Sequence, residues 1–104
     1  MGTEYTIHFR DERDDQKLND CDGYCDPTIH AIVIDKHSTP ETMDCDDLRA
    51  LIRRVIRHEL VHAFLFESGL GACSEWAQNE EMVDWIARQF PKMLKAFQAL
   101  NVSE

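Results

Sequence analysis

The segment IRHELVHAFLFE, residues 56–67, decides how this chain folds, because it sets two histidines and a glutamate into a stretch that is otherwise largely apolar. It ends a longer pattern, residues 46–67, in which apolar side chains recur three or four positions apart, as on one face of a helix. That face consists of Leu48, Leu51, Ile52, Val55, Ile56 and Leu60. Much of the other face is occupied by Arg49, Arg53, Arg54 and Arg57. The pattern predicts a helix over 46–67.

Residues on both sides of this segment are typical of helix ends. Thr42 or Asp44 can cap its start, and acidic residues in the first turn suit the helix dipole. Gly69 and Gly71 favour an end shortly after residue 67.

A second helix is predicted over residues 75–89, with Ser74 as its N-cap. Pro91 should stop or kink this helix, because proline has no backbone N–H to donate. Residues 92–100 then form a short third helix.

Two or three strands precede the helices. Residues 5–9 and 28–35 are rich in β-forming side chains, and a short strand around Tyr24 can pair with 28–35 as a hairpin. Residues 10–22 are polar and predict a loop. The fold class is therefore α+β, a small sheet of two or three strands packed on two or three helices, in one domain over 1–104.

Composition excludes several classes of partner. The formal net charge is -9, which disfavours nucleic acid and anionic membrane surfaces. No apolar run reaches the roughly 18 residues of a membrane span, and the first residues do not resemble a signal peptide, so we expect a cytoplasmic protein. The acidic stretches 11–26 and 41–47 are typical of solvated loops, with attraction of basic substrate segments as the alternative.

The four cysteines leave two interpretations open. In a reducing cytoplasm Cys21, Cys25, Cys45 and Cys73 are expected to be ordinary thiols. A structural zinc site built from them is the alternative, although only Cys21 and Cys25 are closely spaced.

His58, Glu59 and His62 form the candidate site. Positions four apart in a helix lie about 40° apart around its axis, so the two imidazoles point the same way and can bind one metal ion. Glu59 lies about 100° round and can reach a metal-bound water without being a ligand. Buried imidazoles and carboxylates need partners, which a metal supplies. The alternative is a pair of partly exposed histidines beside a Glu59–arginine ion pair.

A catalytic zinc ion needs a third protein ligand, and the candidates lie in EWAQNEEMVDWIARQF, residues 75–90. Glu80 and Glu81 flank the apolar stripe of this segment, and Asp84 follows Glu80 by one turn. We interpret Glu80 as the third ligand, with Glu81 as its competitor. Asp84 can accept a hydrogen bond from Nδ1 of a ligating histidine. The alternative is that these acids are surface residues.

HELVH, residues 58–62, followed by NEEMVD, residues 79–84, resembles the gluzincin metallopeptidases, in which H-E-x-x-H is completed by a glutamate of the next helix in an Asn-Glu-x-x-x-Asp pattern. The matching residues are Asn79, Glu80 and Asp84, which favours the first of the two glutamates. The strand-then-helix layout is most similar to small ImmA/IrrE-type and phage-encoded metallopeptidases, over residues 28–90. The chain departs from ImmA/IrrE-type proteins in having EEMVDWIA in place of an E-x-x-A-N-x-F-A-like motif.

This resemblance implies a minimal zincin-like core and a zinc-dependent peptidase with one Zn²⁺ per chain, held by His58, His62 and Glu80. Glu59 would be the general base, taking a proton from the zinc-bound water and passing it to the leaving amine. The substrate would be a protein or peptide. Its chemistry and the oligomeric state of the chain stay open.

Two further features of the site are expected beside the metal. The strand over 28–35 should run along the cleft, and a peptide could pair with it if it is an edge strand. Oxyanion stabilisation needs an extra donor, for which His30, Tyr24 and His37 are the candidates.

Two other functions compete with hydrolysis. A zinc-binding but proteolytically inactive adaptor or regulator of a phage or mobile element would need no general base beside its ligands, so Glu59 favours the enzyme. A metal-free helical interaction module would keep its stability in a chelator.

Overall fold

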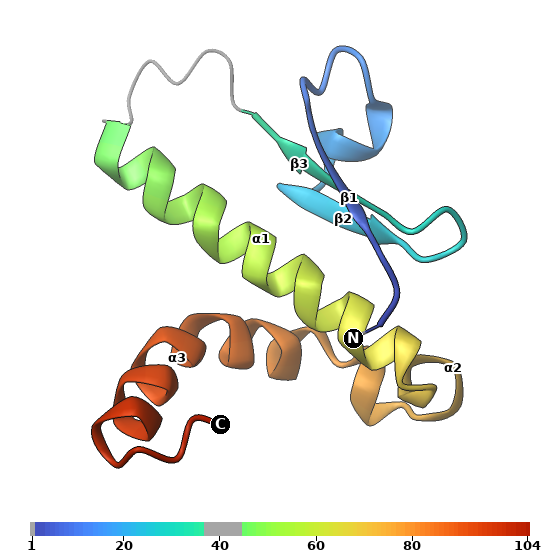
Figure 1. Cartoon of the computed structure of the whole chain (residues 1–104). Helices are drawn as coiled ribbons and strands as arrows, with labels where there is room; N and C mark the ends of the chain where they lie inside the picture. The colour runs from blue at the N-terminus through green and yellow to red at the C-terminus, as the bar shows by residue number, and fades with distance from the viewer. Residues whose placement is uncertain (1, 37–44) are drawn as a thin grey trace.

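The computed structural model describes residues 2–36 and 45–104 and has the predicted α+β class (Figure 1). Its elements are β1 (Thr6–Arg10), η1 (Gln16–Asn19), β2 (Gly23–Asp26), β3 (Ala31–Asp35), α1 (Cys45–Glu67), α2 (Leu70–Cys73), η2 (Trp76–Gln78) and α3 (Glu80–Ala99). The predicted caps Thr42 and Asp44 and the candidate His37 lie outside the described residues. None of the helices in the described ranges is long and apolar enough to cross a membrane.

The three strands form a mixed sheet in the order β1–β3–β2. β3 lies at the centre, parallel to β1 and antiparallel to β2, so the hairpin predicted around Tyr24 is confirmed. The strand predicted over 28–35 begins only at Ala31, because residues 27–30 form the hairpin turn, in which His30 has a φ of 52°. The condition for pairing a peptide with this strand, that it be an edge, is not met, since β3 is paired on both sides.

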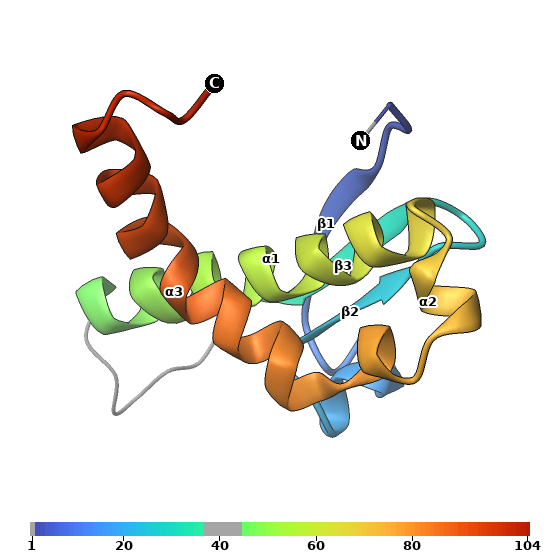
Figure 2. The ribbon, with the colours of Figure 1, turned by 90° about the horizontal axis from the view of Figure 1, so that it is seen from below.

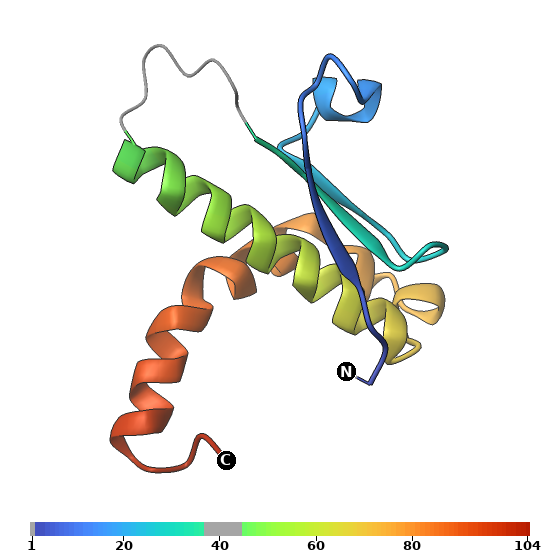
Figure 3. The same cartoon turned by 45° about the horizontal axis from the view of Figure 1, so that its top comes forward.

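The predicted helix over 46–67 is confirmed as α1, which packs its apolar face on the sheet. The centre of the core is formed by Ile32, Ile34 and Ala63. Around them pack the partly buried Tyr5, Cys25, Ile52, Val55, Ile56 and Leu60. Gly69, with a φ of 86°, allows the chain to turn after α1 as predicted. In the views of Figures 1 and 3, α1 lies between the sheet and α3.

Gly23 lets β2 approach α1 closely. A Cβ atom at this position would lie 2.9 Å from the carbonyl oxygen of Val33 and 2.9 Å from Cγ1 of Val55. Both distances are shorter than real Cβ contacts, so any side chain here must displace the neighbouring strand β3, the helix α1 or both. The start of β2 therefore depends on a glycine for space and not for an unusual φ.

Gly23→Ala is expected to lower the free energy of unfolding by about 1–3 kcal/mol, the usual cost of overpacking. Urea denaturation measures it. In a double-mutant cycle, Val55→Ala should reduce this cost because it removes one of the two clashing groups. Fully additive effects would show that the contact with Val55 is not the cause.

The second long helix begins later than predicted. Residues 74–79 leave the helical path through the short η2 turn, and α3 begins at Glu80. Its N-cap is Asn79, whose side-chain oxygen accepts a hydrogen bond from the backbone N–H of Met82 at 2.8 Å. Ser74, the predicted cap, instead follows the end of α2. Because α3 begins at Glu80 and not at Glu75, Glu80 lies in the first turn of the helix.

Pro91 lies inside α3, which continues to Ala99, so a separate third helix is not formed. The helix changes direction along its course, as Figure 2 shows, and its C-terminal half extends away from the sheet. A proline at position 91 cannot donate a hydrogen bond to the carbonyl of Ala87 and so favours such a bend. Of the two effects predicted for Pro91, the helix is bent and is not ended there.

Candidate metal centre

α1 brings the side chains of His58, Glu59 and His62 together. Their ligand atoms all lie within 4.8 Å of one another. The Nε2 atoms of the two histidines are 3.2 Å apart, as expected for residues spaced by four along a helix. Both imidazoles therefore point at the same small volume beside α1.

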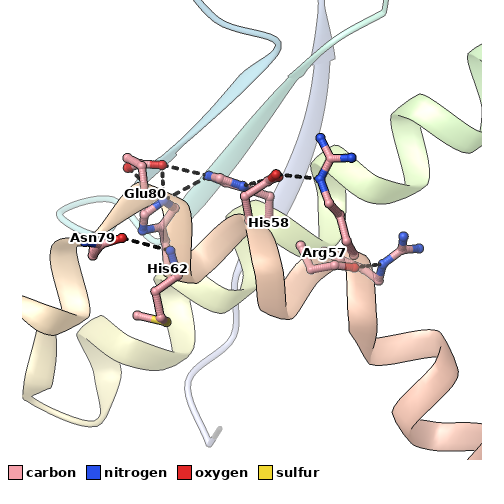
Figure 4. A network of polar contacts seen from close by, with 9 residues as sticks. Arg57, His58, His62, Asn79 and Glu80 are labelled. Carbon is pink, nitrogen blue, oxygen red and sulfur yellow. Dashed lines mark hydrogen bonds and ion pairs between the residues drawn. The ribbon is translucent and has the colours of Figure 1, made fainter.

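Glu80 reaches this volume from the start of α3 (Figure 4). Its Oε2 atom lies 2.9 Å from Nε2 of His58 and 3.2 Å from Nε2 of His62. Within the described ranges no hydrogen bond or ion pair joins Glu81 to either imidazole. The structure therefore places Glu80, and not its competitor, against the histidines.

The three donor atoms fit a tetrahedral zinc site. With Zn–N distances of about 2.0–2.1 Å, two ligands of a tetrahedron are separated by about 3.3 Å. The separations here are 2.9, 3.2 and 3.2 Å. Two imidazoles and one carboxylate are also the donor set of catalytic zinc sites, in which a fourth position stays open. The residues present therefore suit this metal.

Asp84 lies one turn after Glu80 and touches the other nitrogen of His58. Its Oδ1 atom is 3.3 Å from Nδ1 of His58, and its Oδ2 atom accepts a hydrogen bond of 2.6 Å from Nε of Arg88. These contacts lower the pKa of Asp84, chiefly through Arg88 and then through His58. An ionised Asp84 favours a proton on Nδ1 of His58, which leaves Nε2 free to bind a metal.

Glu59 is buried beside the donor atoms, with only 5% of its surface exposed. Burial raises the pKa of its carboxyl group to about 7; nearby His58 opposes the shift and Glu80 adds to it. Among the described residues its Oε2 atom has no hydrogen-bond partner. A buried carboxylate oxygen without a partner is uncommon in proteins and is typical of a site that binds something. The ion pair of Glu59 with an arginine, which was the alternative interpretation, is not formed among the described residues.

A second contact fixes α3 against α1. Nε of Arg57 donates a hydrogen bond of 2.7 Å to the carbonyl oxygen of Ala87, the group that lost its helical donor to Pro91. Arg57 was expected on the polar face, yet it satisfies a backbone group of the neighbouring helix. Because Arg57 precedes His58, this bond holds α3 next to the candidate ligands.

The donor atoms open into a cavity of about 730 Å³ between α1, β2 and the segment that leads into α3. Sequence reasoning missed two parts of its wall. One is Arg54, which the helix pattern placed on the polar face, although its spacing of four from His58 indicates the same side. The other is β2, whose residues Gly23 and Cys25 line the cavity.

Of the candidate oxyanion donors in the described residues, Tyr24 lines the cavity but its hydroxyl is engaged by another residue, and His30 does not line the cavity. The hydroxyl of Tyr24 donates to Asp15, and burial followed by this contact raises the pKa of Tyr24 to about 12. His30 lies 3.7 Å from Glu67 at the far end of α1. Neither group is directed at the metal centre by the contacts that it makes.

Three of the four cysteines, Cys21, Cys25 and Cys73, are free thiols. Burial, and then the charge of Glu59, raise the pKa of Cys25 to about 11, so this thiol stays protonated at neutral pH. In the part of the chain that the structure describes, the one group that could hold a metal contains no cysteine. The interpretation of these three as ordinary thiols is the one that the structure supports.

No known protein family matches the chain, and no curated protein or solved structure is significantly similar to it. The resemblance to gluzincins therefore depends on the site motifs alone.

Asp84→Ala should weaken zinc binding about 10- to 100-fold, because His58 loses the group that fixes its tautomer. Competition with a chromophoric chelator measures the affinity. Glu81→Ala is the matched control, since it removes an exposed acid of the same helix. Equal losses in both variants would show that only net charge matters.

Arg57→Leu should lower the free energy of unfolding by about 1–3 kcal/mol, because the buried carbonyl of Ala87 loses its donor. In a Pro91→Ala background the cost should be smaller, since residue 91 then supplies an N–H to the same carbonyl. Urea denaturation of the four proteins in this cycle tests the coupling. A cost that is the same in both backgrounds would contradict the pairing of Arg57 with the proline.

Proposed function

We propose that the chain is a zinc-dependent metallopeptidase of gluzincin type with a minimal zincin-like core. One observation carries the proposal. His58 and His62 of α1 and Glu80 of α3 converge at 2.9–3.2 Å. The buried carboxylate of Glu59, whose Oε2 atom has no partner among the described residues, lies beside them. This is the donor set and the general base that peptide hydrolysis by a zinc enzyme requires.

Each residue has a distinct task in this mechanism. His58, His62 and Glu80 would hold one Zn²⁺ per chain. The ion would polarise the scissile carbonyl and lower the pKa of water at its open position towards about 7. Glu59 takes a proton from the attacking water and passes it to the leaving amine. Asp84 holds His58 in the tautomer that leaves Nε2 free.

The peptide substrate would bind along β2. This strand pairs with β3 on one side and is an edge of the sheet on the other. Its residues Gly23 and Cys25 line the cavity that contains the donor atoms. A peptide that added to this edge by backbone hydrogen bonds would pass in front of Glu59. β2 would therefore run along the cleft and pair with the peptide, as was predicted for the strand over 28–35.

The test combines metal analysis with one substitution. The purified wild-type chain, loaded with zinc, is expected to hold one Zn²⁺ per chain and to hydrolyse peptides. Glu59→Gln should keep the zinc and lose about 10²–10⁴-fold in kcat/KM, the usual contribution of a general base. Elemental analysis and a quenched-fluorescence peptide library measure the two properties.

Glu81→Gln is the control for this experiment, because it removes one acidic charge without touching the imidazoles. It should leave both zinc content and activity unchanged. Absence of stoichiometric zinc after loading would overturn the proposal.

A second function is favoured by one observation. The C-terminal half of α3 exposes apolar side chains that a partner protein could cover, namely Phe90, Met93, Phe97 and Leu100. A zinc-binding adaptor or regulator, such as one carried by a phage, would use this surface and would not need Glu59. The two functions differ in the Glu59→Gln experiment, since partner binding should survive that substitution.

A further inference from the structure

Among the described residues, Arg54 is a cation that lines the candidate active site and has no partner. It lies four residues before His58 and eight before His62, so the three side chains share one side of α1. It lines the cavity and is half-buried. Across residues 2–36 and 45–104, no hydrogen bond or ion pair engages its guanidinium. A partly desolvated guanidinium without an acceptor is ready to bind an anion.

The other arginines close to the centre are already engaged. Arg57 bonds to the carbonyl of Ala87, and Arg88 pairs with Asp84. Arg54 is therefore the cationic group of this wall that remains available to a ligand. Asp22 lines the same cavity, but its side chain is exposed whereas Arg54 is half-buried.

The side chains of α1 that line the cavity differ in chemistry along the helix. Arg54 lies about one turn before His58, whereas Leu65 and Phe66 lie beyond His62. The histidines and Glu59 lie between them along α1. An extended ligand would thus place a polar or anionic group on one side of the reacting bond and an apolar group on the other.

The direction of β2 decides which part of a peptide meets Arg54. Gly23 lies against Val55, and Cys25 packs into the cluster around Ala63, so β2 runs in the same direction as α1. Antiparallel strand pairs outnumber parallel pairs about two- to three-fold. A peptide paired antiparallel to β2 runs opposite to α1, and its C-terminal part therefore lies at the Arg54 end.

We propose that Arg54 binds a carboxylate on the C-terminal side of the scissile bond, which makes the substrates acidic on that side. The carboxylate is either the free C-terminus of a short peptide or the side chain of an aspartate or glutamate, because a guanidinium recognises both in the same way. This inference rests on the proposed peptidase function. It names the substrate class of the same site.

Peptide binding to the zinc-loaded, full-length Glu59→Gln protein tests the inference without hydrolysis. The probes are acetyl-Leu-Ala-Ala-Ala as free acid and as amide, and acetyl-Leu-Ala-Glu-Ala-amide with its Gln counterpart. Isothermal titration gives the ratio of affinities for each charged and neutral pair. Arg54→Gln should lower the ratio of at least one pair about tenfold, the effect of losing about 1.4 kcal/mol of charge-assisted hydrogen bonding.

Two variants separate recognition from net charge. Arg53→Gln makes the same change of charge on the exposed neighbour and should leave both ratios unchanged. Arg54→Lys should restore part of the preference, because it keeps the charge and loses the two-pronged contact. The pair that responds identifies the source of the carboxylate. Equal affinities for charged and neutral peptides in the parent protein, or equal effects of Arg53→Gln and Arg54→Gln, would overturn the proposal.

Zinc content and titrations of the metal-free protein keep this inference separate from the proposed function. If the chain binds no zinc, the peptidase proposal fails, while a charged-peptide preference that depends on Arg54 would still identify an anion site. If the wild-type chain binds zinc and hydrolyses peptides but shows no such preference, only the assignment of Arg54 fails.

Discussion

Three donor atoms from two helices meet within 3.2 Å at the contact between α1 and α3, and the rest of the molecule is arranged around them. Two of these atoms are imidazole nitrogens and the third is a carboxylate oxygen. If neither imidazole carries a proton on Nε2, all three atoms present lone pairs that repel one another, and a shared cation would relieve that repulsion. A proton on Nε2 of either histidine would instead make a hydrogen bond. This cluster of polar atoms, and not the apolar contacts, distinguishes the helix pair from ordinary packing.

Two contacts between a side chain and the backbone hold α3 in the position that brings Glu80 to the histidines. Asn79 caps the first turn and so places Glu80 at the point where the chain enters the helix. Further along, Pro91 removes one helical hydrogen bond, and Arg57 supplies a replacement from the neighbouring helix. A proline inside a helix is usually destabilising by about 3 kcal/mol. Here the freed carbonyl becomes the attachment point between the two helices.

The sheet supplies one wall of the cavity, through β2. β3 is buried on all sides and anchors α1, which leaves β2 as the edge strand beside the site. Gly23 lets that strand lie close to Val55 of α1, and Gly23 and Cys25 line the cavity together with Glu59. Burial raises the pKa of the Glu59 carboxyl group, and among the described residues its Oε2 atom has no partner. Along α1 the cavity is lined by Arg54 before the histidines and by Phe66 after them.

Local pattern and spacing were enough to predict α1, the hairpin of β2 and β3, and the common direction of His58 and His62, because each depends on residues close together in the chain. The start of α3 could not be read in this way, since Ser74 and Asn79 are both good caps and tertiary packing selects between them. The contact of Arg57 with α3 was also beyond the helix pattern, which separates polar from apolar side chains but not solvent from a neighbouring helix. The spacing of Arg54 from His58 does indicate a shared side of α1, but it does not show that β2 closes a cavity over that side.

The sequence by itself therefore determined which residue types share a face of each element and which three side chains of α1 form the candidate site. Only the tertiary structure decided between Glu80 and Glu81 at the imidazoles, placed β3 at the centre of the sheet with β2 at one edge, and formed the cavity that Arg54 lines. These three features depend on how elements that are distant in the chain pack together. That packing, and not the neighbours in sequence, decides which element a side chain points toward.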